Sequence, residues 1–254
     1  MAKKKYIAVF DSGVGGVSVL RELMALMPGE DYYYFGDSAN APYGPRSTDE
    51  VRRLTLQAAE HLFALGAKCL VVACNTATAA AIGALRQKYP HKIIIGIEPA
   101  LKLAADRHPG GTIGVMATDV TLREEKFAAL VQRCQENATV IPLPSPGIVE
   151  LVEADRAESD EAYRLLLSEL GPYVGKLDAL VLGCTHYPFA QRVMRQILGE
   201  NVDILHGGPG TARETQRRLA EAGSLSEGSG SLTIENSSAD PRMIQLTCRL
   251  LESE

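Results

Sequence analysis

The chain has 254 residues, of which 46% are hydrophobic, and its formal net charge at pH 7 is −5. The length fits one large domain or two small ones, and the composition argues against disorder. The acidic balance argues against nucleic acid as the main partner, and no apolar run is long enough to cross a membrane. The first apolar run stops at Asp11, too early for a signal peptide, so we expect a cytoplasmic protein.

Apolar, strand-like runs alternate with amphipathic, helix-like stretches along most of the chain. The predicted strands are Ile7–Phe10, Tyr32–Phe35, Leu70–Ala73, Ile93–Ile97, Ile113–Met116, Val140–Leu143, Leu180–Leu182 and Ile204–Leu205. The predicted helices include Val51–Leu65, Ala77–Lys88, Leu122–Gln135, Glu161–Leu170, Thr211–Ala222 and Pro241–Glu252. The stretch Ser224–Ser231, rich in Gly and Ser, is predicted to be a surface loop. This alternation predicts an α/β fold with parallel sheets.

The two halves of the chain contain similar segments in the same order. The run IAVFDSG at residues 7–13 matches IGVMATD at 113–119, and CLVVACNT at 69–76 matches ALVLGCTH at 179–186. We interpret this as a duplicated α/β unit. The prediction is two pseudo-symmetric parallel-sheet α/β domains, residues 1–97 plus 207–254 and residues 98–206, with the active site in the cleft between them.

Five cysteines occur, and no two have the CxxC spacing: Cys69, Cys74, Cys134, Cys184 and Cys248. An odd number in a chain of this length argues against a disulfide framework. Cys69, Cys134 and Cys248 are interpreted as small buried hydrophobic residues. Cys74 and Cys184 differ, because each follows a strand-like run and small polar residues come next. Ligands bind at such strand ends in parallel sheets, and thiol pKa values fall at the helix N-termini found there.

If the halves face each other, the two strand-end thiols point at one ligand from opposite sides. One thiolate and one thiol can remove the α-proton of an amino acid from one face and return a proton on the other. Repulsion between two thiolates would keep the number of ionised thiols at one. A zinc site at Cys184 and His186 is disfavoured because no further ligands occur at recognisable spacing, and a Cys–His hydrolase leaves Cys74 unexplained.

Polar groups near the two thiols are expected to bind the substrate. Asn75, Thr76, Thr185 and His186 flank the cysteines and can receive the negative charge that develops on a carboxylate. Asp11 and Ser12 follow the first strand and are expected to hold an ammonium group and to tune a thiol. The glycines of residues 13–16 let backbone approach a ligand, although a phosphate-binding loop would look similar.

Five motifs carry a family resemblance: FDSGVGG at Phe10–Gly16, GDSANAPYG at Gly36–Gly44, ACNTATA at Ala73–Ala79, IGVMAT at Ile113–Thr118 and LGCTHYP at Leu182–Pro188. In this order they resemble the bacterial glutamate racemases, of the cofactor-independent aspartate/glutamate racemase superfamily. The resemblance implies interconversion of L- and D-glutamate for peptidoglycan without pyridoxal phosphate, metal or nucleotide. The expected partner is the small-molecule substrate, with no nucleic acid and no membrane, and a homodimer stays open.

The resemblance also implies roles for individual residues. The acid/base residues are Cys74 and Cys184, and the groups that assist them are Asp11, His186 and Glu153. The substrate-binding residues are Asp11, Ser12, Pro42, Tyr43, Gly44, Asn75, Thr76, Thr118, Thr121, Thr185 and His186. Glu150 is a rival to Glu153, because this chain has Ser145–Pro146 where the family often has cysteine–proline. Two alternatives stay open: an aspartate racemase, whose substrate is one methylene shorter, and a non-catalytic acidic amino-acid binding protein.

Overall fold

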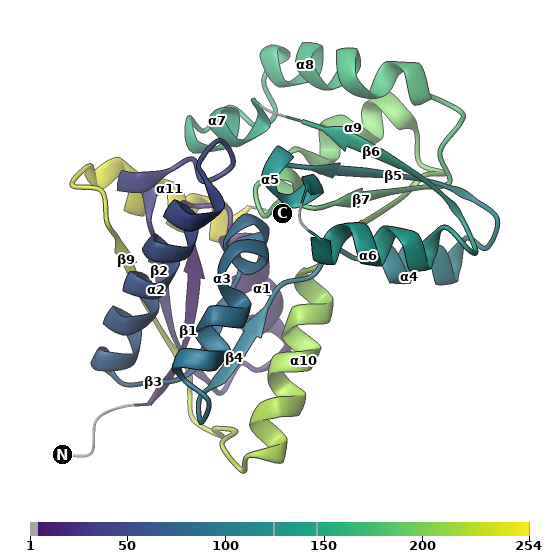
Figure 1. Cartoon of the computed structure of the whole chain (residues 1–254). Helices are drawn as coiled ribbons and strands as arrows, with labels where there is room; N and C mark the ends of the chain where they lie inside the picture. The colour runs from purple at the N-terminus through teal and green to yellow at the C-terminus, as the bar shows by residue number, and fades with distance from the viewer. Residues whose placement is uncertain (1–4, 124, 146, 254) are drawn as a thin grey trace.

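Two parallel β-sheets organise the molecule, and each belongs to its own α/β unit (Figure 1). The computed structural model describes residues 5–123, 125–145 and 147–253. The first sheet has the order β4-β3-β1-β2-β9, with β1 (Tyr6–Asp11), β2 (Asp31–Gly36), β3 (Ala67–Val72), β4 (Ile93–Gly96) and β9 (Ser231–Asn236). The second has the order β6-β5-β7-β8, with β5 (Thr112–Ala117), β6 (Thr139–Pro144), β7 (Ala179–Leu182) and β8 (Asp203–His206). Neighbouring strands are parallel throughout both sheets.

The strand orders confirm the predicted pseudo-symmetry of the two halves. The first four strands of the chain are arranged 4-3-1-2, and the next four are arranged 8-7-5-6, which is the same order. Strands β1 and β5 therefore occupy equivalent places, as do β3 and β7. Because β3 precedes Cys74 and β7 precedes Cys184, the two cysteines lie at equivalent strand ends.

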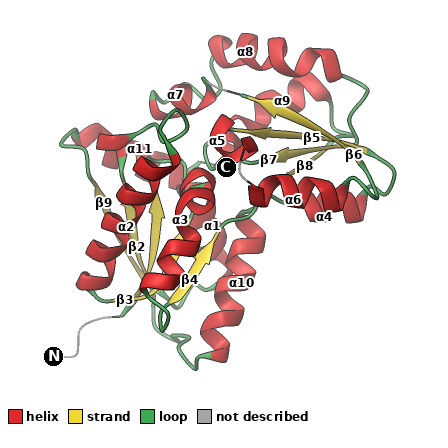
Figure 2. Cartoon of the chain, viewed as in Figure 1, coloured by secondary structure: helices red, strands yellow, loops and turns green. Residues whose placement is uncertain are grey.

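The helices lie on both faces of the sheets, as connections between parallel strands require (Figure 2). In the first unit they are α1 (Val17–Leu26), α2 (Thr48–Leu65), α3 (Asn75–Lys88), α10 (Gly208–Glu221) and α11 (Pro241–Glu252). In the second they are α4 (Leu101–Arg107), α5 (Asp119–Arg123), α6 (Glu125–Cys134), α7 (Ile148–Glu153), α8 (Asp160–Leu170) and α9 (Gln191–Leu198). Short 3-10 helices are η1 (Ser38–Asn40), η2 (Gly171–Tyr173) and η3 (Tyr187–Ala190).

Local sequence explains where several helices begin and end. The Ser47 side chain accepts a hydrogen bond from the Glu50 N–H at the start of α2, and Gly66 ends that helix with a left-handed φ of 114°. The Asp240 side chain caps α11, and Pro241 stands at its first turn. At the start of α3 the cap is a thiol, because the Cys74 sulfur accepts from the Ala77 N–H at 3.4 Å.

A continuous apolar core joins the two units. One cluster of buried side chains includes Val9 and Val71 of the first sheet together with Leu180 and Leu182 of the second. Separate clusters cover the other face of each sheet. Of the helices in residues 5–123, 125–145 and 147–253, none combines the length and the apolar character that a membrane span requires.

Most predicted elements are confirmed, but the structure also contains elements that were not named from the sequence, among them α1, α4, α7 and α9. Strand β9 was not predicted: chain that was expected to be a loop up to Ser231 leads into an edge strand beside β2. Its residues are only partly buried, so the hydrophobic pattern is weak. The helix expected over residues 122–135 corresponds to α5 and α6, which begin at Asp119 and end at Cys134 on either side of residue 124, outside the described residues. The helix expected over 211–222 begins earlier, at Gly208. Because β9 pairs with β2 and α11 packs on α1, we propose that residues 207–254 belong to the first domain.

Candidate active site

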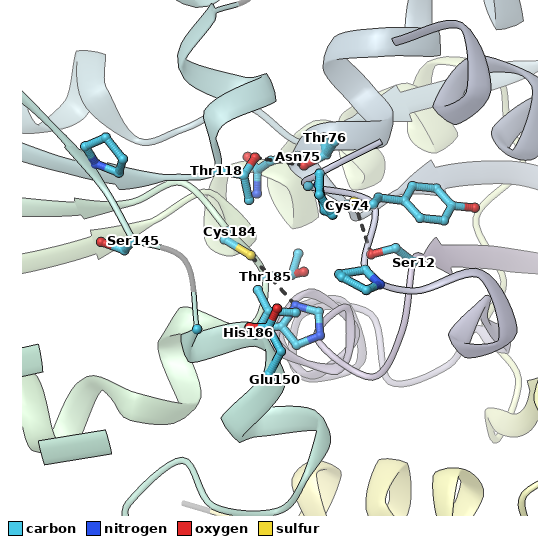
Figure 3. A pocket seen from close by; sticks show the side chains of 17 residues that line it. Ser12, Cys74, Asn75, Thr76, Thr118, Ser145, Glu150, Cys184, Thr185 and His186 are labelled. Atoms are coloured by element: carbon cyan, nitrogen blue, oxygen red, sulfur yellow. Dashed lines mark hydrogen bonds between the residues drawn. The ribbon is translucent and has the colours of Figure 1, made fainter. Parts of the chain in front are cut away.

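A small cavity of about 150 Å³ lies between the two units, and both strand-end cysteines line it (Figure 3). Cys74 comes from the first unit, and Cys184 comes from the second. The cavity is lined by Ser12, Pro42, Tyr43, Gly44, Pro45, Cys74, Asn75, Thr76, Thr118, Pro144, Ser145, Gly147, Val149, Glu150, Cys184, Thr185 and His186. It is open enough for a small molecule, and its walls carry hydroxyl, amide, thiol and imidazole groups.

Cys74 is held as a thiol by its surroundings. Its sulfur lies 3.5 Å from Ser12 Oγ, and the side chain is only 5% exposed. The pKa of Cys74 is raised to about 12: burial is the largest cause and the nearby charges of Asp11 and Cys184 add to it, while hydrogen bonds with Ser12 and the Ala77 N–H act in the opposite direction. The expectation of a lowered thiol pKa is therefore wrong for Cys74: the N–H at the start of α3 does lower it, but desolvation of the thiolate outweighs that effect.

Cys184 has a different set of neighbours, which form a chain of hydrogen bonds. The Cys184 sulfur lies 3.7 Å from His186 Nδ1, and His186 Nε2 lies 2.7 Å from Glu153 Oε1 at the end of α7. Burial disfavours the imidazolium, but the hydrogen bonds to Cys184 and Glu153 raise the pKa of His186 well above its usual value. Burial likewise opposes the Glu153 carboxylate, but His186 and the Val14 N–H lower its pKa. These opposite shifts favour an ion pair between the buried His186 and the partly buried Glu153.

Asp11 lies behind the cavity wall and does not line the cavity. Its carboxylate accepts hydrogen bonds from the Gly13 N–H at 3.0 Å and from the Thr185 hydroxyl at 2.9 Å. Complete burial raises the pKa of Asp11, and the charge of His186 opposes that shift. The carboxylate therefore acts on Cys74 through its charge and on Thr185 through a hydrogen bond.

Asn75 supplies the clearest unused polar group in the site. It is 6% exposed, and within the described part of the chain neither its side-chain oxygen nor its nitrogen has a hydrogen-bond partner. A buried amide without partners is costly, and a bound ligand would supply the missing bonds. Beside it, the hydroxyls of Thr76 and Thr118 lie 3.1 Å apart and link the two units.

Eleven of the predicted site residues line the cavity, namely Ser12, Pro42, Tyr43, Gly44, Cys74, Asn75, Thr76, Thr118, Cys184, Thr185 and His186. Asp11, Glu153 and Thr121 lie one layer behind it, where Thr121 Oγ1 accepts a hydrogen bond from the Thr118 hydroxyl at 3.1 Å. Glu150 lines the cavity, whereas Glu153 contacts His186, so the two glutamates have different places.

Sequence reasoning missed the wall formed by Pro144, Ser145, Gly147 and Val149. These residues lie at and just after the end of β6, the strand equivalent to β2. The loop after β2 supplies Pro42, Tyr43 and Gly44. Because β2 and β6 are equivalent strands of the repeat, the sequence could have predicted that the loop after β6 also reaches the site. Pro146, which the sequence analysis named together with Ser145 as a departure from the family pattern, lies outside the described residues.

The fold and this site define a protein of two similar α/β units that places one strand-end thiol from each unit in the wall of a single cavity. Residues 13–215 match the model of the Asp/Glu/Hydantoin racemase family. The chain is 48% identical to a glutamate racemase of Clostridium perfringens, over 98% of this chain and 97% of the relative. The chain belongs to the Asp/Glu/Hydantoin racemase family, so the predictions of family and of a racemase, an isomerase, are confirmed.

Solved structures agree with this placement. Glutamate racemase isoform RacE1 from Bacillus anthracis matches with a TM-score of 0.88 and 31% identity, over 99% of this chain and 96% of that chain. The glutamate racemase of Francisella tularensis, solved in complex with D-glutamate, matches with a TM-score of 0.85 and 25% identity, over 99% and 95%. The similarity extends over both units.

Proposed function

We propose that this protein is a glutamate racemase that interconverts L- and D-glutamate by proton transfer between Cys74 and Cys184. The observation that carries the proposal is one cavity with a thiol from each unit in its wall. Relatives named glutamate racemase, one of them solved with D-glutamate, support glutamate as the substrate. The cavity is small, which suits a single amino acid.

The unequal surroundings of the two thiols support a division of roles. The His186 ring, whose pKa is raised, lies 3.7 Å from the Cys184 sulfur, whereas burial and the charge of Asp11 raise the pKa of Cys74. We therefore assign the thiolate of the resting pair to Cys184 and the thiol to Cys74. The Cys184 thiolate takes the α-proton from one enantiomer, and the Cys74 thiol delivers a proton to the opposite face. In the reverse direction Cys74 must act as the base. The ammonium group of the bound amino acid, a cation in the same cavity, lowers the cost of that thiolate.

The polar wall supports the carbanion that forms between these steps. Charge moves from the α-carbon toward the carboxylate as the proton leaves, and fixed donors stabilise it. The Asn75 amide and the hydroxyls of Thr76 and Thr118 lie in the cavity wall with the two thiols and can supply such donors. Because Asn75 carries both a free donor and a free acceptor, it can meet a carboxylate and an ammonium group of the same ligand.

Deuterium exchange tests the proposal directly. Pure protein with L-glutamate or D-glutamate in deuterated water, without added cofactor, should bring the circular dichroism signal to zero and place deuterium on the α-carbon. An unchanged optical signal with no deuterium would refute the racemase. Faster turnover of aspartate than of glutamate would indicate an aspartate racemase, and tight glutamate binding without exchange would indicate a binding protein.

The biological role is a further part of this proposal. We propose that the protein works in the cytoplasm and supplies D-glutamate for peptidoglycan synthesis. Its gene should restore growth to a bacterial strain that requires external D-glutamate, and the Cys74→Ser variant should not. If the Cys74→Ser variant also restored growth, the supply of D-glutamate would not depend on the proposed thiol chemistry.

A further inference from the structure

The turn between β1 and α1 contains glycines that do not line the cavity. Among the described cavity-lining residues only Ser12 comes from this turn, so its glycines face elsewhere. A Cβ atom added to Gly13 would lie 2.0 Å from Glu153 Oε1, and one added to Gly15 would lie 2.4 Å from His186 Nδ1. Neither glycine has a φ in the left-handed region, so what these positions require is space rather than an unusual backbone conformation.

Hydrogen bonds hold this turn against the second unit. The Val14 N–H donates to Glu153 Oε1 at 2.9 Å, the same oxygen that meets His186 Nε2. The Ser18 hydroxyl lies 2.9 Å from the backbone oxygens of both Gly15 and Thr185. From the other side, the buried Tyr34 hydroxyl donates to the Gly13 carbonyl at 2.7 Å.

We propose that residues 13–16 form a positioning turn, in which the first unit seats the Glu153–His186 pair of the second unit against Cys184. The inference rests on the proposed function, because it concerns the acid–base support of one of the two thiols. The supports of Cys74, which are Ser12 and the Ala77 N–H, come from its own unit. The support of Cys184 is completed only by contact between the units. The sequence pattern that resembled a phosphate-binding loop thus serves a side-chain pair.

A defect in the acid–base support of only one thiol cannot be detected by comparing the rates of L-to-D and D-to-L racemisation. The enantiomers have equal free energies, so kcat/KM must be equal in both directions whatever happens to one thiol. Elimination from 3-chloroglutamate isolates each thiol, because it needs a single base. The thiolate takes the α-proton, the C–H electron pair forms the Cα–Cβ double bond, and chloride leaves. The resulting enamine tautomerises to an imine, which water hydrolyses to 2-oxoglutarate and ammonia.

The test places Gly15→Ala in two backgrounds and measures 2-oxoglutarate from each chloroglutamate isomer. With Cys184 as the sole base (Cys74→Ser), elimination should fall by about 100-fold, the lower end of what a positioned acid–base group contributes. With Cys74 as the sole base (Cys184→Ser), it should fall less than about threefold. Tyr34→Phe, which frees the Gly13 carbonyl, should give a smaller loss in the same background only. Gly83→Ala in α3 is the matched control, since nothing lies within 4 Å of its added Cβ.

The possible outcomes distinguish a failure of the positioning turn from a failure of the proposed racemase function. Equal losses in both backgrounds from Gly15→Ala and Tyr34→Phe, in folded protein by far-UV circular dichroism, would overturn the positioning turn. If the unmodified protein racemises glutamate and both single-thiol variants eliminate chloride, the proposed function stands in either case. If no variant eliminates chloride and the unmodified protein does not racemise glutamate, the proposed function itself is wrong.

Discussion

His186 Nε2 lies 2.7 Å from Glu153 Oε1, and the other nitrogen of the same ring lies 3.7 Å from the Cys184 sulfur. Both ring nitrogens are thus engaged, one by an anion and one by the thiol. Cys74 has no histidine among these contacts; its sulfur meets Ser12 and the start of α3. The two thiols are equivalent in topology and unequal in electrostatics, and the predictions below follow from that difference.

Glu153→Gln should move the basic limb of the pH–rate profile to lower pH. Glu153 is one of the groups that raise the pKa of His186, so its removal lets the imidazolium lose its proton at a lower pH. The loss of a hydrogen bond to a charged group, about 1.5–3 kcal/mol, predicts a fall in kcat of roughly 10- to 100-fold. Measurement of kcat and kcat/KM from pH 6 to pH 10 tests this.

Glu150→Gln is the matched control for that variant. Glu150 lies on the same helix, α7, and lines the cavity, but Glu153 is the residue bonded to His186. Glu150→Gln should therefore leave the basic limb in place and alter KM at most. A shift of the limb in Glu150→Gln with none in Glu153→Gln would reverse the assignment of the two glutamates.

Cys74→Ser and Cys184→Ser should each lower racemisation by more than about 1,000-fold, because a hydroxyl is a far weaker acid than a thiol and one face loses its proton carrier. Circular dichroism of each glutamate enantiomer measures the loss. Each variant should still eliminate chloride from one enantiomeric series of 3-chloroglutamate. Near wild-type turnover by either variant would contradict the two-thiol mechanism.

Asn75→Leu should separate stability from activity. The amide has no partner within the described protein, so an apolar side chain of similar volume removes no hydrogen bond and should leave Tm unchanged or higher. Loss of bonds to a charged ligand should lower kcat/KM by roughly 10- to 100-fold. Thr78→Val is the opposite control, because its hydroxyl donates to the Val72 carbonyl at 3.1 Å: Tm should fall and kcat/KM should hold. A large drop in Tm for Asn75→Leu would count against a ligand-binding amide.

The Glu153–His186 pair should stabilise the fold most between about pH 4.5 and pH 6.5. The pKa of Glu153 is lowered from 4.5, so its contribution is present above that value and is lost as pH falls through the folded pKa. The pKa of His186 is raised above 6.5, so its contribution is present below that value and is lost as pH rises through the folded pKa. The difference in Tm between the unmodified protein and Glu153→Gln, measured from pH 3 to pH 10, should peak in this window. A difference that does not vary with pH would show that the pair does not couple to folding.

Local patterns predicted the strands well because each is a short apolar run that ends at a polar corner. Strand β9 was not predicted because it lies at a sheet edge, where only alternate residues such as Leu232 and Ile234 pack on the core. The raised pKa of Cys74 was also not predicted, since the sequence indicates the helix N-terminus but not the depth of burial. The choice between Glu150 and Glu153 needed the turn of α7 that aims one of them at His186.

The sequence by itself determined the two strand-end thiols, their polar flanks and the repeat that makes their positions equivalent. These features depend on residues close together along the chain, whose periodicity can be read directly. Only the tertiary structure decided that both thiols share one cavity, that Asp11 stands behind it, and that glycines of one unit make room for Glu153 and His186 of the other. Desolvation and contacts between units arise from packing of distant segments, which no local pattern records.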